Sequence, residues 1–151
     1  MGDYYYRVEH SGSQARLDGD DGIVLRRLPK RPIFYPTDDL RRWNYYEWKY
    51  GRGVIENHLN LENRRPTPCI STIRGDRDAA ECLADFLVRA GKRNVVIHTI
   101  CVPDNLRWSV NIWWMPKLVE IYDLRRTVRE NEYIFLVNIP AELIENTEWV
   151  N

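Results

Sequence analysis

Three short segments of the sequence contain side chains that could act together on a ligand. Arg7 lies among apolar residues in an early β-prone run, and a guanidinium there could hold a carboxylate or a phosphate through two N–H groups. Ser71 and Thr72 end a short β-prone run before a predicted helix, where small hydroxyls could hold a ligand or a neighbouring carboxylate. Glu132 opens a late β-prone run and Glu130 lies two residues before it, and their side chains would point to the same side if that segment is extended.

Each segment also has a purely structural interpretation. Arg7 could be a salt-bridge partner, and Ser71 and Thr72 could simply form the turn before a helix. Glu130 and Glu132 could be solvated charges in a polar segment. These structural interpretations are not independent of one another, because the three segments either meet in the fold or do not.

Short signatures of other enzyme classes are absent. The sequence has neither a GxxxxGK[ST] loop nor GxGxxG, and it lacks HExxH and GxSxG. The histidines, His10, His58 and His98, are far apart and have no obvious ligand partners, so we expect no metal site. His98 lies in an apolar run, which favours a hydrogen-bonded core histidine.

The cysteines also lack the spacing of a metal site or a dense disulfide scaffold. We interpret Cys69, Cys82 and Cys101 as buried thiols. One disulfide with one free thiol remains open if the protein is secreted.

The helices and strands that must position these residues are expected to form one α+β domain over residues 1–151. Glycines Gly51 and Gly53 are expected to end the first helix, with a weaker second helical piece over 54–61. Asp76 is expected to cap the most convincing helix, whose alanine-rich and leucine-rich face is apolar. The expected strands cover residues 4–8, 23–25, 69–73, 94–102, 108–114 and 132–139. The expected helices cover residues 38–50, 77–90 and 117–126. Residues 140–144 are expected to form a turn or short helix, and residues 145–151 a tail.

Composition limits the possible function classes. The chain has 151 residues, of which 44% are hydrophobic and 29% charged, as in a globular protein. Lys and Arg number 22 and so do Asp and Glu, a balance that disfavours a mainly electrostatic grip on nucleic acid. No apolar run approaches a membrane span, and the first residues are unlike a signal peptide. We therefore expect no membrane partner, and a protein that is either cytosolic or secreted with its leader removed.

The order of the three segments resembles the Arg–Ser–Glu class of ADP-ribosyltransferases, which includes cholera-type and pierisin-type toxins. The matching features are an aromatic residue before Arg7 on the first strand, an apolar run before Ser71 and Thr72, and a Glu-x-Glu segment ending at Glu132. An Ile-Pro pair follows Glu132 by seven residues, as in that family. The run RRPTPCIS at residues 64–71 resembles an uncharacterised fungal branch of this superfamily. The resemblance extends from residue 4 to residue 144.

This resemblance implies a fold of two small β-sheets separated by a cleft that binds NAD. Arg7 would contact the NAD phosphates or ribose, and Ser71 with Thr72 would orient the ribose beside nicotinamide. Glu132 would hydrogen-bond the ribose 2′-hydroxyl and stabilise the cationic sugar as nicotinamide leaves. Glu130 would face the incoming nucleophile, which favours an arginine side chain of a protein target. The candidates for stacking on the flat rings of NAD are Tyr4, Trp43, Tyr45, Tyr46, Trp48 and Tyr50.

The sequence thus predicts a mono-ADP-ribosyltransferase that uses NAD as substrate, as an effector or toxin. Two alternatives stay open. One is an NAD glycohydrolase, and the other is a non-catalytic interaction module on the same fold. The oligomeric state is undetermined.

Overall fold

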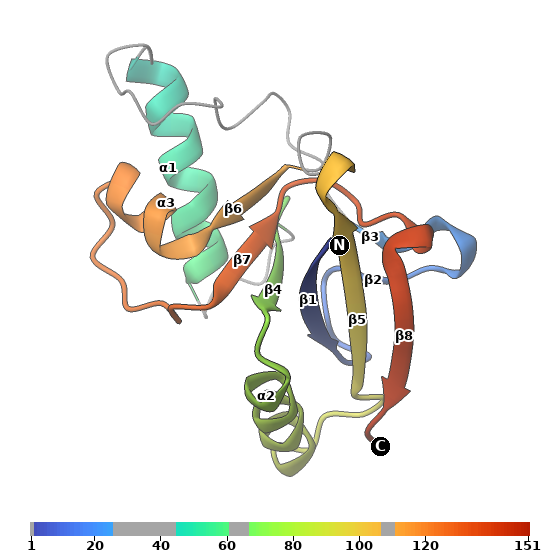
Figure 1. Ribbon diagram of the computed structural model, residues 1–151. Helices are drawn as coiled ribbons and strands as arrows, with labels where there is room; N and C mark the ends of the chain where they lie inside the picture. The colour runs from blue at the N-terminus through green and yellow to red at the C-terminus, as the bar shows by residue number, and fades with distance from the viewer. Residues whose placement is uncertain (1, 26–44, 61–66, 107–110) are drawn as a thin grey trace.

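A six-stranded antiparallel sheet organises the protein. The computed structural model describes residues 2–25, 45–60, 67–106 and 111–151 (Figure 1). The strands of this sheet lie in the order β6-β7-β4-β1-β5-β8. They are β1 (Gly2–Glu9), β4 (Ile70–Arg74), β5 (Val96–Pro103), β6 (Ile112–Trp114), β7 (Glu132–Phe135) and β8 (Ile144–Trp149).

The central strand β1 is held very differently by its two neighbours. Eight residues of β1 pair with β5, whereas the ladder between β1 and β4 consists of the pairs Tyr5–Arg74 and Tyr6–Ile73. The sheet is therefore continuous but has two wings, β6-β7-β4 and β1-β5-β8, joined by a short ladder (Figure 1).

In the described part of the chain, three helices and a small second sheet cover the strands. The helices are α1 (Tyr45–Leu59), α2 (Arg77–Arg89) and α3 (Met115–Ile121), and the second sheet pairs β2 (Arg16–Leu17) with β3 (Ile23–Val24). Short 3-10 turns cover Gly19–Asp21, Asp104–Leu106 and Ala141–Leu143. Helices α1 and α3 lie beside the β6-β7-β4 wing, while α2 connects β4 to β5 (Figure 1).

The core has three parts. Ala80 and Ala84 of α2 pack on Val8, Ile73 and neighbouring residues of β1, β4 and β5. A second cluster joins α1 and α3 to β7, and a third lies beneath the β2-β3 sheet. Small alanine side chains let α2 approach the strands closely, so the short connection from β4 into α2 is held firmly.

Several sequence predictions are confirmed. The fold class is α+β, and strands occur near residues 4–8, 69–73 and 94–102. The strand expected over 132–139 is confirmed for its first half only, because β7 ends at Phe135. Asp76 caps α2 by accepting a hydrogen bond from the Ala79 backbone N–H at 2.9 Å. Gly91 follows the helix with a φ of 83°, a conformation that favours glycine.

Two predicted elements were wrong. Helix α1 passes through Gly51 and Gly53 and continues to Leu59, so neither glycine ends it. Gly51 instead lets the helix pack closely against the side chain of Tyr122. A Cβ at Gly51 would lie 2.3 Å from the Tyr122 hydroxyl oxygen. The expected tail after residue 144 is instead the edge strand β8, paired with β5. Its exposed charged residues resemble a loop in sequence but are common on edge strands.

Other predictions were right in part or lie outside the described residues. Of the helix expected over 38–50, residues 38–44 are outside the described part. The helix expected over 117–126 is α3, which begins and ends earlier, and the strand expected over 108–114 is described only as β6. The three cysteines are free thiols, but only Cys69 is buried; Cys82 is exposed on α2 and Cys101 is half-buried. The prediction of buried thiols therefore fails at Cys82.

Candidate functional site

Arg7, Ser71 and Glu132 line one small pocket beside the short ladder between β1 and β4. Its volume is about 140 Å³. Thr72 lines it too, so four of the five predicted site residues meet although they lie on three separate strands. The remaining lining residues are Tyr6, Val8, Ile73, Leu83 and Arg129. We call this cavity the Arg7 pocket.

Arg7 bridges the two wings where their backbone ladder ends. Its Nη1 donates to the Ser71 carbonyl at 3.0 Å and its Nη2 donates to the Ala15 carbonyl at 3.0 Å. Its Nε is buried and has no hydrogen-bond partner among the described residues. Burial lowers the pKa of the guanidinium, although the Glu9 carboxylate opposes this effect. A guanidinium remains protonated at neutral pH even so, and its Nε–H stays available to donate to an acceptor.

The Ser71 hydroxyl lies in a chain of hydrogen bonds that includes a histidine. His58 Nε2 is 2.7 Å from Ser71 Oγ, and His58 Nδ1 is 2.9 Å from Thr67 Oγ1. Burial, together with the nearby Arg7 charge, lowers the pKa of His58 to about 4, so its ring is neutral at pH 7. The Ser71 hydroxyl also acts on the Glu132 carboxylate, whose pKa it lowers. His58 thus orients the hydroxyl that acts on this carboxylate.

His58 has a partner that sequence reasoning missed. It lies 13 residues before Ser71 and on a different element, so no local spacing relates the two. His98 follows the prediction of a hydrogen-bonded core histidine, because it is buried and its ring contacts Thr147 Oγ1 and the Glu9 carboxylate. Among the described residues, no group of three His, Cys, Asp or Glu side chains could hold a metal ion.

Glu132 is the half-buried carboxylate of the pocket. It opens β7 opposite Ile73, and Ser71 pairs with Ile134, so Glu132 and Ser71 lie on the same face of the sheet. Burial raises the pKa of Glu132, although the Arg129 charge and the Ser71 hydrogen bond act in the opposite direction. A carboxylate in this setting is poorly solvated when ionised, which strengthens its interaction with a positive charge that enters the pocket.

Thr72 and Glu130 occupy different positions from Ser71 and Glu132. Thr72 is buried, and its hydroxyl donates to the Tyr133 carbonyl at 2.9 Å, which links β4 to β7. Glu130 is exposed and does not line the Arg7 pocket. The Glu132 backbone N–H donates to the Arg129 carbonyl at 3.2 Å, so a turn, rather than an extended chain, precedes β7. The condition under which both glutamates would point to one side is not met.

Four of the six aromatic side chains proposed for stacking are described, and none of these four lines the Arg7 pocket. Trp48 and Tyr50 pack in the core cluster formed with α3, and Tyr46 is exposed. Tyr4 is exposed and does not line the Arg7 pocket. Trp43 and the side chain of Tyr45 are outside the described part of the chain. Tyr6, which the stacking candidates omitted, is the aromatic residue among the described residues that line this pocket.

A second cavity of about 290 Å³ lies on another side of Arg7. His58, Thr67 and the loop residues Gly12 and Gln14 also line it. Because Arg7 lines both cavities, a ligand larger than the Arg7 pocket has adjoining polar space available on the other side of this side chain.

Comparisons with known proteins identify a family but no activity. The model of the family described as a domain of unknown function, DUF7587, matches residues 1–150. No curated protein and no solved structure matches the chain. Within the described residues, no helix is both long enough and apolar enough to cross a membrane. Since the match covers nearly all residues, the chain belongs to the DUF7587 family, a domain of unknown function.

Proposed function

We propose that this protein is a mono-ADP-ribosyltransferase that binds NAD beside Arg7 and transfers ADP-ribose to a protein side chain. The observation that supports this most is the meeting of Arg7, Ser71 and Glu132 in one pocket. They come from strands far apart in the sequence, in the order and with the neighbours that resemble Arg–Ser–Glu transferases. The short β1–β4 ladder beside the pocket supports the proposed two-winged, transferase-like fold.

Each residue has a chemical role in this reaction. The free Arg7 Nε is a donor for a phosphate or ribose oxygen of NAD. Ser71 holds the Glu132 carboxylate, which accepts a hydrogen bond from the ribose 2′-hydroxyl and stabilises positive charge on the sugar. The bond between C1′ and the nicotinamide nitrogen breaks, and its electron pair leaves with nicotinamide. The acceptor nitrogen then bonds to C1′ and loses a proton.

The acceptor is an arginine side chain in this proposal, because Glu130 lies two residues before Glu132. Glu130 is exposed, where a carboxylate can meet a guanidinium of a docked protein. The same exposure of Glu130 favours the first alternative, an NAD glycohydrolase. Water can reach a site whose Glu130 stays in solvent, and water would then be the acceptor of ADP-ribose.

The second alternative is a non-catalytic interaction module. It is favoured by the bonds that Arg7 makes to two backbone carbonyls and by the bond between His58 and the Ser71 hydroxyl. These contacts would also be made if the three residues only joined the wings of the sheet.

Incubation with labelled NAD and an arginine-rich protein tests these possibilities. For the transferase we expect label on the protein and release of nicotinamide, and both should fall at least about 100-fold in Glu132→Gln. The control of the same chemical change is Glu142→Gln, since Glu142 is exposed and lies outside the Arg7 pocket, in the 3-10 turn Ala141–Leu143. Circular dichroism should show both variants folded.

Glu130→Gln separates the outcomes further. In a transferase it should lower arginine labelling and spare nicotinamide release. Nicotinamide release without labelling in the wild-type protein would support the glycohydrolase. Absence of both NAD binding and NAD turnover would refute both enzymatic functions and leave the interaction module.

A further inference from the structure

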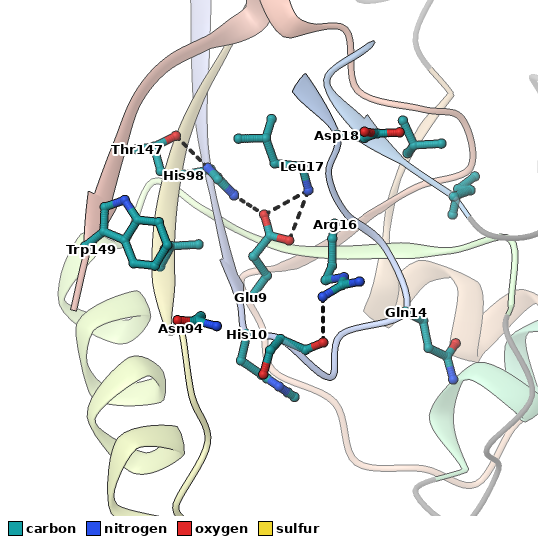
Figure 2. Close-up of a pocket in the computed structure, with 14 residues that line it drawn as sticks. Glu9, His10, Gln14, Arg16, Leu17, Asp18, Asn94, His98, Thr147 and Trp149 are labelled. Atoms are coloured by element: carbon teal, nitrogen blue, oxygen red, sulfur yellow. Dashed lines mark hydrogen bonds and ion pairs between the residues drawn. The ribbon is translucent and has the colours of Figure 1, made fainter. Parts of the chain in front are cut away.

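A cavity larger than the Arg7 pocket lies away from it and is unused by the proposed reaction. Its volume is about 620 Å³, within the range of small-molecule sites. It opens between the loop that follows β1, the β2-β3 sheet and the edge strand β8 (Figure 2). We call it the β8 pocket. Glu132 and Ser71 do not line it.

A buried polar network forms one wall of the β8 pocket. Thr147 Oγ1 is 2.7 Å from His98 Nδ1, and His98 Nε2 contacts the Glu9 carboxylate. Glu9 also accepts the Leu17 backbone N–H, at 3.2 Å to Oε2 and 3.3 Å to Oε1. Glu9 and His98 are both almost fully buried. The network links β1, β5, β8 and β2, so the wall is rigid, and a carboxylate on it can accept hydrogen bonds from hydroxyl or amino groups.

The opposite parts of the rim differ in chemistry. Trp149 of β8 is 67% exposed and forms a flat aromatic wall. Arg16 and Asp18 lie on the other side of Glu9 in Figure 2, on β2 and just after it. Arg16 Nη1 donates to the Ser11 carbonyl at 2.7 Å, which fixes the guanidinium while its other N–H groups remain. Val24, Leu25 and Val96 add an apolar surface.

These features match the parts of one kind of molecule. An exposed tryptophan stacks on a flat ring, a carboxylate accepts sugar hydroxyls, and a guanidinium binds a phosphate. The carboxylates of Glu9 and Asp18 disfavour an anion near them, so a phosphate must lie at Arg16. We propose that the β8 pocket binds a nucleoside monophosphate, with the base on Trp149, the ribose toward Glu9 and Asp18, and the phosphate on Arg16.

This site does not depend on the transferase activity proposed above, because the two pockets share no lining residue. AMP is the probe, and isothermal titration calorimetry of the full chain is the assay. We expect saturable binding of AMP at one site. Adenosine, which lacks the phosphate, and ribose 5-phosphate, which lacks the ring, should each bind at least about tenfold more weakly.

Variants locate the site. Trp149→Ala and Arg16→Gln should each weaken AMP binding about tenfold or more, whereas Trp149→Tyr should keep most of it because a stacking ring remains. The controls are Trp114→Ala and Arg89→Gln, since both side chains are exposed and neither lines the β8 pocket. Glu132→Gln should leave AMP binding unchanged.

The contrary outcomes are equally definite. No saturable binding of AMP would overturn the proposal. AMP binding that persists in both Trp149→Ala and Arg16→Gln would also overturn it. AMP binding that is lost in Glu132→Gln would overturn it too, because the ligand would then occupy the Arg7 pocket. Loss of NAD turnover in Glu132→Gln with AMP binding retained would support both sites.

Discussion

Two glycines in the middle of α1 should respond to alanine in opposite directions. Gly51 and Gly53 lie on the same helix, only two residues apart. An added Cβ at Gly51 would lie 2.3 Å from the Tyr122 hydroxyl oxygen and 2.7 Å from its Cζ atom. An added Cβ at Gly53 would meet nothing within 4 Å. The two substitutions therefore share their effect on helix propensity and differ only in contact.

The magnitude follows from the surroundings of Tyr122. This ring is fully buried at the end of α3, and Trp48 Nε1 and Arg52 Nε hold α1 there through the carbonyls of Ile121 and Tyr122, at 3.1 and 3.0 Å. The ring cannot move aside freely, so α1 must shift. Overpacking of this kind costs about 1–3 kcal/mol, against a gain of up to about 1 kcal/mol from replacing glycine in a helix.

Urea unfolding followed by circular dichroism measures both effects. We expect Gly51→Ala to lower the free energy of unfolding by about 1–2 kcal/mol and Gly53→Ala to raise it by about 0.5–1 kcal/mol. A Gly51→Ala protein as stable as Gly53→Ala would refute the argument that Gly51 serves close packing. If both variants were destabilised equally, the helix would not continue through these positions as described.

Three further predictions concern ionisable groups. The folded pKa of His58 is about 4 against 6.5 when unfolded, so its neutral form contributes stability that is lost as pH falls from 6.5 to 4. At about 1.4 kcal/mol per pKa unit, this loss of stability is about 3 kcal/mol. Urea unfolding of the wild type and of His58→Gln, each at pH 7 and at pH 4, should show this loss only in the wild type. The proposed reaction needs ionised Glu132, whose pKa is raised by burial, so NAD turnover should decline on acidification at a pH above the ordinary glutamate value of 4.5. A pH profile that stays flat down to 4.5 would contradict that role. A thiol reagent at pH 8 should modify exposed Cys82 first and leave Cys69 unmodified, because burial raises the pKa of Cys69 to about 12; Cys82→Ser should remove the fast phase.

The predictable part of the fold followed from local patterns. The helix α2 was recognisable because its cap Asp76, its apolar face and Gly91 are all close in sequence. The strand β1 stood out as an aromatic run, and β4 and β5 stood out as apolar or β-branched runs. In β5 nearly every position is apolar, as expected of a strand that is covered on both faces. The order of Arg7, Ser71 and Glu132 along the chain was enough to propose that they meet.

Only the tertiary structure decided how those residues are held and which other residues join them. The His58–Ser71 contact, the role of Gly51 and the pairing of β8 with β5 all depend on elements distant in sequence, which periodicity cannot relate. The sequence alone determined the side-chain chemistry available: a guanidinium, hydroxyls and carboxylates on predictable strands. The structure placed Glu132 in the pocket and Glu130 in solvent, because a turn rather than an extended chain precedes β7.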